Sequence, residues 1–262
     1  MKDVLDKIIE AKRIEVARQK GELSLAELKA KVEAMPEGPR RSMRESLSSS
    51  ASGIIAEFKR RSPSKGWINE GARAEEIPAS YAEAGASALS ILTDEEFFGG
   101  GLHDLEVARP MVEIPIIRKE FIIDEYQLYQ AKLVGADAVL LIAAALTLDE
   151  CRVLTSKAHY LGLEVLLELH CEAELEYISQ DVDMVGINNR NLGTFHTDIA
   201  NSFRLAELLP SDVVKVSESG ISDPKMVSEL RRAGFRGFLI GENFMRTNSP
   251  GESLRSFIKG VE

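Results

Sequence analysis

The segments AGASALSIL (residues 84–92), VGADAVLLI (134–142), LGLEVLLEL (161–169) and AGFRGFLIG (233–241) share one pattern, in which a glycine precedes a short apolar run. Glycine ends a helix in the left-handed conformation at little cost, and the chain can then turn directly into a buried strand. The four segments form a weak internal repeat of helix-to-strand junctions. Such junctions indicate strands and helices that alternate along a parallel sheet.

Short apolar runs, each followed by a helical pattern, continue from Gly53 to the end of the chain. Eight such units close most naturally into a (β/α)8 TIM barrel. An open doubly wound sheet is the alternative, but no G-x-G-x-x-G motif follows any of the runs. The expected strands are residues 54–59, 88–92, 114–119, 138–142, 164–168, 184–187, 213–218 and 237–240.

The first fifth of the chain has helical but no strand signals. Residues 2–20 and 25–35 have helical periodicity, Gly21 is expected to end the first helix, and a capping-box pattern, S-x-x-E, opens the second. We therefore expect an N-terminal helical extension over residues 1–52 and a single catalytic barrel domain over residues 53–262.

Composition excludes several classes of protein. The 262 residues are 44% apolar, and 32 basic against 42 acidic residues give a formal charge of −10, the opposite of a broad nucleic-acid-binding surface. The longest apolar run, residues 138–146, is too short to cross a bilayer, and the N-terminus lacks a signal-peptide pattern. Two cysteines make no disulfide framework. We expect a cytoplasmic protein that binds neither nucleic acid nor membrane.

Polar residues end five of the expected strands, in each case at a position with inward parity. Reactive groups of a TIM barrel lie at this end. Each of these residues, taken alone, is better explained as a solvated charge at a strand end. Their coincidence along five strands favours a functional site instead. In such a site, charges of both signs shift one another's pKa values. The residues are Glu57, Lys59, Lys119, Glu168, Asn188, Arg190 and Glu218.

Glycines after the last two strands predict a phosphate site. Gly220 and Gly241 are placed where backbone amides hold phosphate in this architecture, although ordinary turns are the alternative. Lys59, on the neighbouring first strand, supplies a cation. The following loop, residues 59–66, is expected to contact the anion through Ser62; a kinase site or a plain solvated loop are the other interpretations.

The four histidines have no metal-ligand spacing, so we expect no metal site. His170 has the parity of Glu168 and is within reach of the mouth, but an exposed position in a loop is the expectation. Residues 97–101 are expected to form either a lid or a plain loop with an apolar anchor.

Seven motifs, in order, resemble the indole-3-glycerol phosphate synthases of tryptophan biosynthesis. The resemblance runs from about Gly53 to Arg246, and a helical N-terminal extension is usual in that family. It implies closure of 1-(2-carboxyphenylamino)-1-deoxyribulose 5-phosphate, a small anionic phosphorylated substrate, to indole-3-glycerol phosphate with loss of CO2 and water, without cofactor or metal. The motifs are IIAEFKRRSPSKG, ILTDEEFFGGG, IIRKEF, VLLELH, GINNRNLGTF, VVKVSESGI and FLIGENFMR.

The resemblance also implies roles for individual residues. Lys119 is similar to the general acid that protonates the substrate ketone, Glu168 to the acid/base group of the dehydration, and Lys59 to a second proton donor that contacts the phosphate. The other positions carried over are Glu57, Asn188 and Glu218 at the ring-closing centre, Arg190 and Ser62 at the anthranilate carboxylate, Ser219, Gly220 and Gly241 at the phosphate, and Phe121 and Leu140 in the aromatic pocket.

A lysine acts as a general acid most effectively when its pKa is lowered toward the working pH, and Lys59 and Arg118 are expected to lower that of Lys119. The sequence departs from the family at Glu120, where Asp is common, and at Glu242, where a small hydroxyl is common. An acid beside a phosphate is unfavourable unless it turns outward, so Glu242 argues against the phosphate assignment more than any other departure does.

Two other functions are weighed. A related isomerase of a phosphoribosyl-aminocarbon substrate commonly uses an Asp/Cys or Asp/Asp pair, in contrast to Lys119 with Glu168. A silent barrel that serves as a binding subunit would have lost mouth residues, and none is lost. We expect a monofunctional enzyme, a monomer or weak homodimer, with contacts to other tryptophan-pathway enzymes left open.

Overall fold

Eight parallel strands close into a barrel in the computed structural model, which describes residues 4–36, 38–191 and 193–261. Neighbours around the barrel follow chain order, and β10 pairs with β1 to close it. The expected (β/α)8 TIM barrel is therefore confirmed, and the alternative of an open doubly wound sheet is excluded. The strands are β1 (Ile54–Phe58), β4 (Ala88–Leu92), β5 (Ile116–Lys119), β6 (Ala138–Ile142), β7 (Glu164–Leu169), β8 (Met184–Asn188), β9 (Val214–Glu218) and β10 (Phe235–Ile240).

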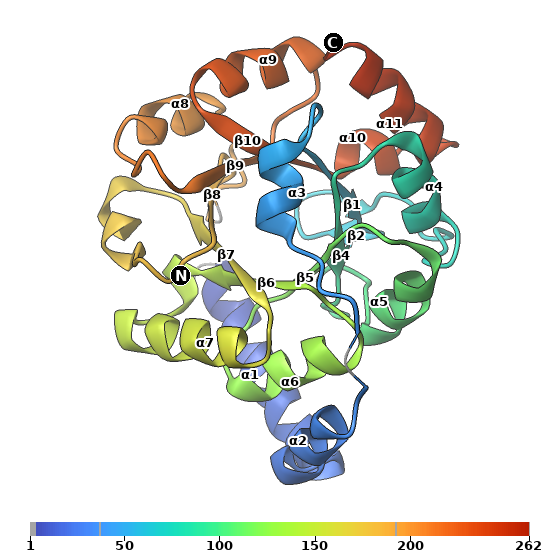
Figure 1. Ribbon diagram of the computed structural model, residues 1–262, viewed down its shortest axis with the longest axis vertical. Helices are drawn as coiled ribbons and strands as arrows, with labels where there is room; N and C mark the ends of the chain where they lie inside the picture. Colours follow the sequence, from blue (N-terminus) through green and yellow to red (C-terminus); the bar gives the residue numbers. More distant parts are fainter. Residues whose placement is uncertain (1–3, 37, 192, 262) are drawn as a thin grey trace.

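Helices surround this barrel (Figure 1). The glycines of the four predicted junctions, Gly85, Gly135, Gly162 and Gly234, all have positive φ angles, between 71° and 101°, as the repeat requires. The helices are α4 (Ile77–Ala84), α5 (Leu102–Ala108), α6 (Glu125–Leu133), α7 (Leu148–Tyr160), α8 (Ala200–Ala206), α9 (Pro224–Arg232), α10 (Glu242–Met245) and α11 (Pro250–Lys259). Short 3-10 turns are η1 (Arg109–Met111), η2 (Ala143–Ala145) and η3 (Glu172–Tyr177), and a two-stranded hairpin joins β2 (Arg61–Ser62) to β3 (Gly66–Trp67).

Side chains in the strands alternate between the barrel interior and the layer beneath the helices. Polar strand-end residues continue the inward rows: Glu168, for example, lies two residues after Leu166 in β7 and shares its inward direction. The predicted parity is therefore confirmed, because period-two alternation is a local property of an extended chain. The interior apolar residues include Ile55, Ile117, Leu140, Leu166, Met184, Val216 and Leu239.

Three helices precede the barrel: α1 (Val4–Glu22), α2 (Leu25–Glu33) and α3 (Met43–Ser49). The capping box of α2 is present as predicted, but α1 continues through Gly21, so the expected stop there is wrong. The helix α3 was not predicted, because its stretch is basic and serine-rich with only two large apolar residues. Within the described ranges, no helix is long and apolar enough to cross a membrane.

The N-terminal helices contact both ends of the barrel: α3 covers one end, and α1 lies along the edge of the other. Met43 and Leu47 of α3 are fully buried with the interior residues, and the helix lies across the near end of the barrel in Figure 1. Ser42, which precedes α3, donates a hydrogen bond to Glu164 at the start of β7. At the opposite end, Leu5 and Ile8 of α1 lie over the strand ends that carry the polar residues.

Candidate active site

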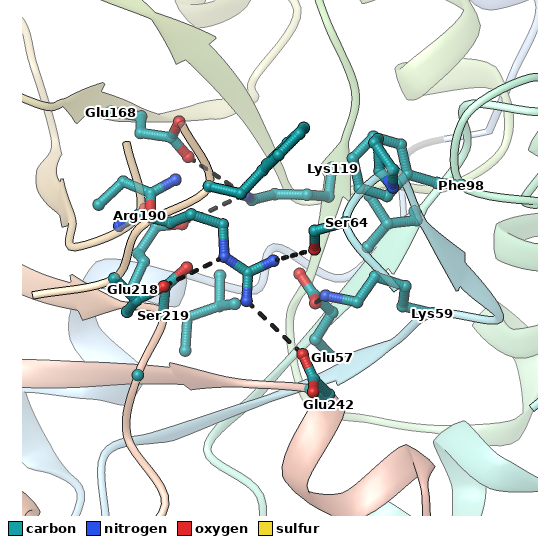
Figure 2. Close-up of a pocket in the computed structure, with 18 of the residues that line it drawn as sticks. Glu57, Lys59, Ser64, Phe98, Lys119, Glu168, Arg190, Glu218, Ser219 and Glu242 are labelled. Atoms are coloured by element: carbon teal, nitrogen blue, oxygen red, sulfur yellow. Dashed lines mark hydrogen bonds and ion pairs between the residues drawn. The ribbon is translucent and has the colours of Figure 1, made fainter. Parts of the chain in front are cut away.

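A cavity of about 510 Å³ opens at the carboxyl ends of the strands (Figure 2). All seven polar strand-end residues predicted from parity line it. The aromatic-pocket candidates, Phe121 and Leu140, and the phosphate-site candidates, Ser219, Gly220 and Gly241, also lie in the wall. The fold thus brings together residues that are separated by up to about 180 positions in the chain.

Lys119 extends from the end of β5 across the cavity to two carboxylates (Figure 2). Its Nζ atom lies 3.2 Å from Oε2 of Glu168 on β7 and 3.1 Å from Oε2 of Glu218 on β9. Burial alone would lower the pKa of this lysine, but the carboxylates of Glu168, Glu218 and Glu57 outweigh burial and raise it above its usual range. Lys119 is therefore held as an ammonium group by the carboxylates that surround it.

The expected lowering of the Lys119 pKa is therefore wrong, and the geometry gives the reason. Arg118 has the opposite parity and points away from the cavity, where it donates hydrogen bonds to Thr93 Oγ1 and to the carbonyl of Gln127. Lys59 is paired with a carboxylate, 2.5 Å from Oε1 of Glu57. Arg118 is itself paired with Glu120 Oε2 at 3.5 Å, so a carboxylate compensates the charge of each of the two cations.

The two carboxylates that share Lys119 differ in charge. Burial alone would raise the pKa of Glu168, but Lys119 and His170 hold it well below its usual range. Burial raises the pKa of Glu218 to about 8; Lys119 opposes this shift and the negative Glu168 adds to it. At neutral pH the pair therefore carries one negative charge, on Glu168, because two like charges at one site do not both ionise.

Two glycines make room for the acidic side chains. A Cβ atom at Gly186 of β8 would collide with Glu218 Oε1, and one at Gly241 would lie 2.5 Å from Glu57 Oε1. Glu57 itself is buried, and although burial alone would raise its pKa, Lys59 and Lys119 hold it below its usual range. Gly186 has the same inward parity as Asn188, but its role as space for a carboxylate depends on the neighbouring strand β9, which carries Glu218.

Arg190 spans the mouth of the cavity. Its guanidinium donates to Ser64 Oγ at 3.2 Å and lies 3.5 Å from Glu242 Oε2 (Figure 2). Glu242 does not turn outward: it lines the cavity and pairs with this arginine, which compensates its charge. A second contact, from Arg190 Nε to Thr197 Oγ1 at 3.4 Å, ties the guanidinium to the loop after β8.

Ser62 lies outside the cavity wall, unlike the other predicted site residues. It is buried in the hairpin, where it pairs with Gly66, and its hydroxyl has no hydrogen-bond partner among the residues that the structure describes. Ser64, two residues later, takes the position that was expected of Ser62. The two-residue error arises because the sequence shows a polar loop but not the hairpin within it.

The segments after β9 and β10 form the part of the cavity expected to bind phosphate. Ser219 and Gly220 both have positive φ angles, 67° and 80°, so the chain turns sharply at the strand end. Wall residues that the sequence analysis did not select are Ser222, Asn243 and Arg246. Their position after the last two strands could have identified these residues from the sequence, because phosphate sites of TIM barrels are built there.

The apolar side of the cavity combines aromatic rings with residues of α1. The rings of Phe98 and Phe121 lie with centroids 6.0 Å apart, and Leu5 and Ile8 complete this wall. Asp94 Oδ1 accepts hydrogen bonds from the backbone amides of residues 97 and 98 and so anchors the loop after β4. The α1 residues were missed because nothing local in the sequence shows that the helix folds back over the mouth.

A buried lysine connects α1 to these loops. Lys12 is 1% exposed, and its Nζ atom lies 3.0 Å from both Asp94 Oδ2 and Glu120 Oε1 and 2.7 Å from Glu15 Oε2. Glu120 therefore interacts with Lys12 rather than with the ammonium group of Lys119. Burial alone would lower the pKa of Lys12, but the surrounding carboxylates raise it above its usual range.

The histidines lie in different parts of the fold. His159 of α7 pairs with Asp183 at 2.8 Å, away from the cavity. His170 follows β7 and lies beside Glu168 with its side chain only 13% exposed, so the expected exposed position is wrong. Over the part of the chain that the structure describes, no group of three or more His, Cys, Asp or Glu residues is placed to hold a metal ion.

Comparison with known proteins identifies close relatives over the whole chain. A family model described as indole-3-glycerol phosphate synthase matches residues 5–257. Proteins of that name from Bacteroides thetaiotaomicron and Aromatoleum aromaticum are 64% and 44% identical, covering 100% and 98% of this chain and 100% and 99% of their own.

Solved structures at low identity share the fold. The 3-hexulose-6-phosphate synthase of Salmonella typhimurium has a TM-score of 0.61, and a tryptophan synthase complex chain from Pyrococcus furiosus has 0.58. Both are 13% identical and cover 80% of this chain, and the match spans 98% and 97% of theirs. At this identity the likeness concerns the barrel alone.

Proposed function

Because the chain belongs to the indole-3-glycerol phosphate synthase family, we propose that the residues at the barrel mouth divide the reaction of that family among themselves. The enzyme is a carboxy-lyase of tryptophan biosynthesis. It closes 1-(2-carboxyphenylamino)-1-deoxyribulose 5-phosphate to indole-3-glycerol phosphate and releases CO2 and water. The arrangement of Lys119 between Glu168 and Glu218 carries the proposal.

Lys119 is the general acid of ring closure. The aromatic carbon that bears the carboxylate attacks the substrate ketone, and the developing negative charge on the ketone oxygen takes a proton from the ammonium group. Loss of CO2 then returns its bonding electrons to the ring. The raised pKa of Lys119 ensures that the proton is present when the substrate arrives, and a well-placed general acid contributes about 10²–10⁴-fold to the rate.

Glu168 and Lys59 serve the dehydration. This step removes a hydroxyl group as water and a proton from the adjacent ring carbon, so it needs a proton donor and a proton acceptor on the two sides of the bond. The ionised Glu168 accepts the ring proton, and Lys59 donates to the leaving hydroxyl. Glu57, 2.5 Å from Lys59 Nζ, holds that ammonium group in place, and Asn188 and Glu218 complete the polar surroundings of the ring.

Two further sets of residues bind the phosphate and the carboxylate of the substrate. Ser219, Gly220 and Gly241 hold the phosphate together with Lys59, where backbone amides and a cation meet. Arg190, supported by Ser64, binds the anthranilate carboxylate. Phe121 and Leu140 contact the aromatic ring, and both are buried in the apolar wall.

The decisive experiment adds the carboxyphenylamino-deoxyribulose phosphate to the purified protein and follows indole fluorescence. The wild type should form product, and Lys119→Ala should lose at least about 100-fold in kcat. Lys132→Ala, a change on the outer helix α6, is the matched control. Product formation by Lys119→Ala at the wild-type rate would refute the role of Lys119, whereas binding without product in the wild type would favour a silent barrel.

We also propose that the enzyme works in the cytoplasm as a monomer or weak homodimer, and that the other tryptophan-pathway enzymes are its possible partners. The acidic composition and the self-contained cavity support this assignment. Light scattering coupled to size exclusion at several protein concentrations tests it, and a concentration-independent dimer would contradict it.

A further inference from the structure

The imidazole of His170 lies beside the carboxylate of Glu168 without lining the cavity. Its Nε2 atom is 3.3 Å from Glu168 Oε1, while Lys119 contacts Oε2 of the same carboxylate at 3.2 Å. The side chain of His170 is 13% exposed. A group in this position touches a candidate catalytic residue but not the substrate.

Glu174 of η3 holds His170 from its other side. Its Oε2 atom accepts a hydrogen bond from the backbone amide of His170 at 2.5 Å and lies 3.8 Å from Nδ1. Within the described part of the chain, neither ring nitrogen of His170 makes a well-aligned hydrogen bond. The carboxylates of Glu168 and Glu174 therefore interact with the ring through its charge. Burial alone would lower the pKa of His170, but Glu168 and Glu174 raise it to about 10.

The contacts around the Glu168–Glu218 pair are asymmetric, and most of the asymmetry comes from His170. Lys119 lies almost equally far from both carboxylates, at 3.2 and 3.1 Å, and so does not by itself favour ionisation of either one. His170 contacts Glu168 and gives that carboxylate a second cation. Asn188 of β8 adds a hydrogen bond to Glu168 that also lowers its pKa, while Glu57 of β1 acts on Lys119.

We propose that His170, clamped by Glu174, is a positioning residue that holds Glu168 against Lys119 and keeps the single negative charge of the Glu168–Glu218 pair on Glu168. The inference rests on the acid/base role of Glu168 proposed above. An ionised carboxylate only accepts hydrogen bonds and protons, whereas a protonated one is a donor. Without the imidazolium, the pair would share its proton, and part of the enzyme would hold Glu168 in the form that cannot accept the ring proton.

The charge of His170 is measured directly by ¹⁵N NMR of the imidazole groups. The chain has four histidines, and His170→Gln identifies the signal. We expect a doubly protonated ring up to about pH 8 and a lower apparent pKa in Glu174→Gln, because one of the two anionic contacts is lost. A neutral His170 ring at pH 7 would overturn the inference.

Kinetics test the consequence for Glu168. His170→Gln should lower kcat by about tenfold or more, a part of the ~10²–10⁴-fold that a positioned acid/base group contributes, with little change in KM. His159→Gln is the matched control, because His159 also pairs with an aspartate but lies on α7 away from the cavity. Equal effects of the two substitutions would contradict the proposal.

A double-mutant cycle separates charge placement from a general loss of packing. Glu218→Gln mimics the protonated form and cannot ionise, so in the His170→Gln background it forces the charge back onto Glu168. We expect the double variant to have a higher kcat than the product of the two single effects predicts. Effects that simply multiply would overturn the inference.

A separate experiment tests the proposed role of Glu168 independently of the inference about His170. If Glu168→Gln kept wild-type kcat, the acid/base role of Glu168 would be refuted. The imidazole signal would then still decide whether His170 holds its proton against this carboxylate, because that signal does not depend on turnover.

Discussion

Replacing Lys12 by Met tests the buried connection between α1 and the barrel mouth. Asp94, Glu120 and Lys12 form a cluster in which each side chain is 1% exposed and both N–O distances are 3.0 Å. Removing one member of a buried ion pair costs about 3–5 kcal/mol when the remaining charge is left buried without a partner. Without Lys12, Glu120 keeps Arg118 at 3.5 Å, but Asp94 keeps no cation among the described residues. Methionine keeps most of the side-chain length, so little of this cost comes from a cavity.

The destabilisation should depend on pH with a definite sign. Burial already raises the pKa of Asp94 in the presence of Lys12, and loss of the cation raises it further. A carboxyl group whose pKa is higher in the folded than in the unfolded protein lowers the stability of the folded state as the pH rises. Because the pKa of Lys12 is raised in the folded protein, this lysine stabilises the wild type by a constant amount at every pH below its unfolded pKa. The difference in the free energy of unfolding between variant and wild type therefore grows from about pH 5.5 to about pH 8.

Urea unfolding followed by far-UV circular dichroism at these two pH values measures the effect, with equal m-values as the check on two-state behaviour. Lys20→Met is the matched control on the same helix: Lys20 pairs with Asp124 at 2.6 Å, but the side chains are 36% and 30% exposed. That exposed pair should contribute less than about 1 kcal/mol. A Lys12→Met effect as small as the control, or one that shrinks as pH rises, would refute the reasoning.

Three further predictions concern the cavity. Gly186→Ala should lower kcat by about 100-fold with the fold intact, because the added methyl group displaces the Glu218 carboxylate; full activity in a steady-state assay would contradict this. Glu218→Gln should stabilise the protein increasingly between about pH 5 and pH 8, since the raised pKa of Glu218 makes its ionised form unfavourable in the folded state; denaturant midpoints at both pH values would show it, and an equal gain at both would argue against it. Ser64→Ala should raise KM more than Ser62→Ala does, because Ser64 supports Arg190 and Ser62 lies outside the wall; initial rates over substrate concentration decide, and the reverse order would restore Ser62.

Local patterns were sufficient to predict the barrel and the polar strand-end residues that line its cavity. The left-handed glycines at Gly85 and Gly135 and the inward parity of Glu168 and Lys119 depend on a few neighbouring residues, so the sequence carries them directly. The architecture then predicts where strand ends meet, because parallel strands of a closed barrel present their carboxyl ends at one mouth. Resemblance to a family added the reaction.

Charge states in the cavity depended on pairs that no local pattern contains. Lys119 was expected to have a lowered pKa, but Glu218 lies 99 residues away in the chain and Glu168 lies 49 residues away, and both face its ammonium group at close range. A pKa is set by burial and by charges within a few ångströms. It therefore requires the positions of all neighbours.

The sequence alone determined the order of strands, the face on which each polar residue lies and the family, because these follow from periodicity and from short motifs. Only the tertiary structure decided that α1 covers the mouth, that Lys12 joins it to Asp94 and Glu120, and that His170 supports Glu168. The physical reason is range: backbone periodicity acts over a few residues, whereas packing and electrostatic contacts join groups at any separation in the chain.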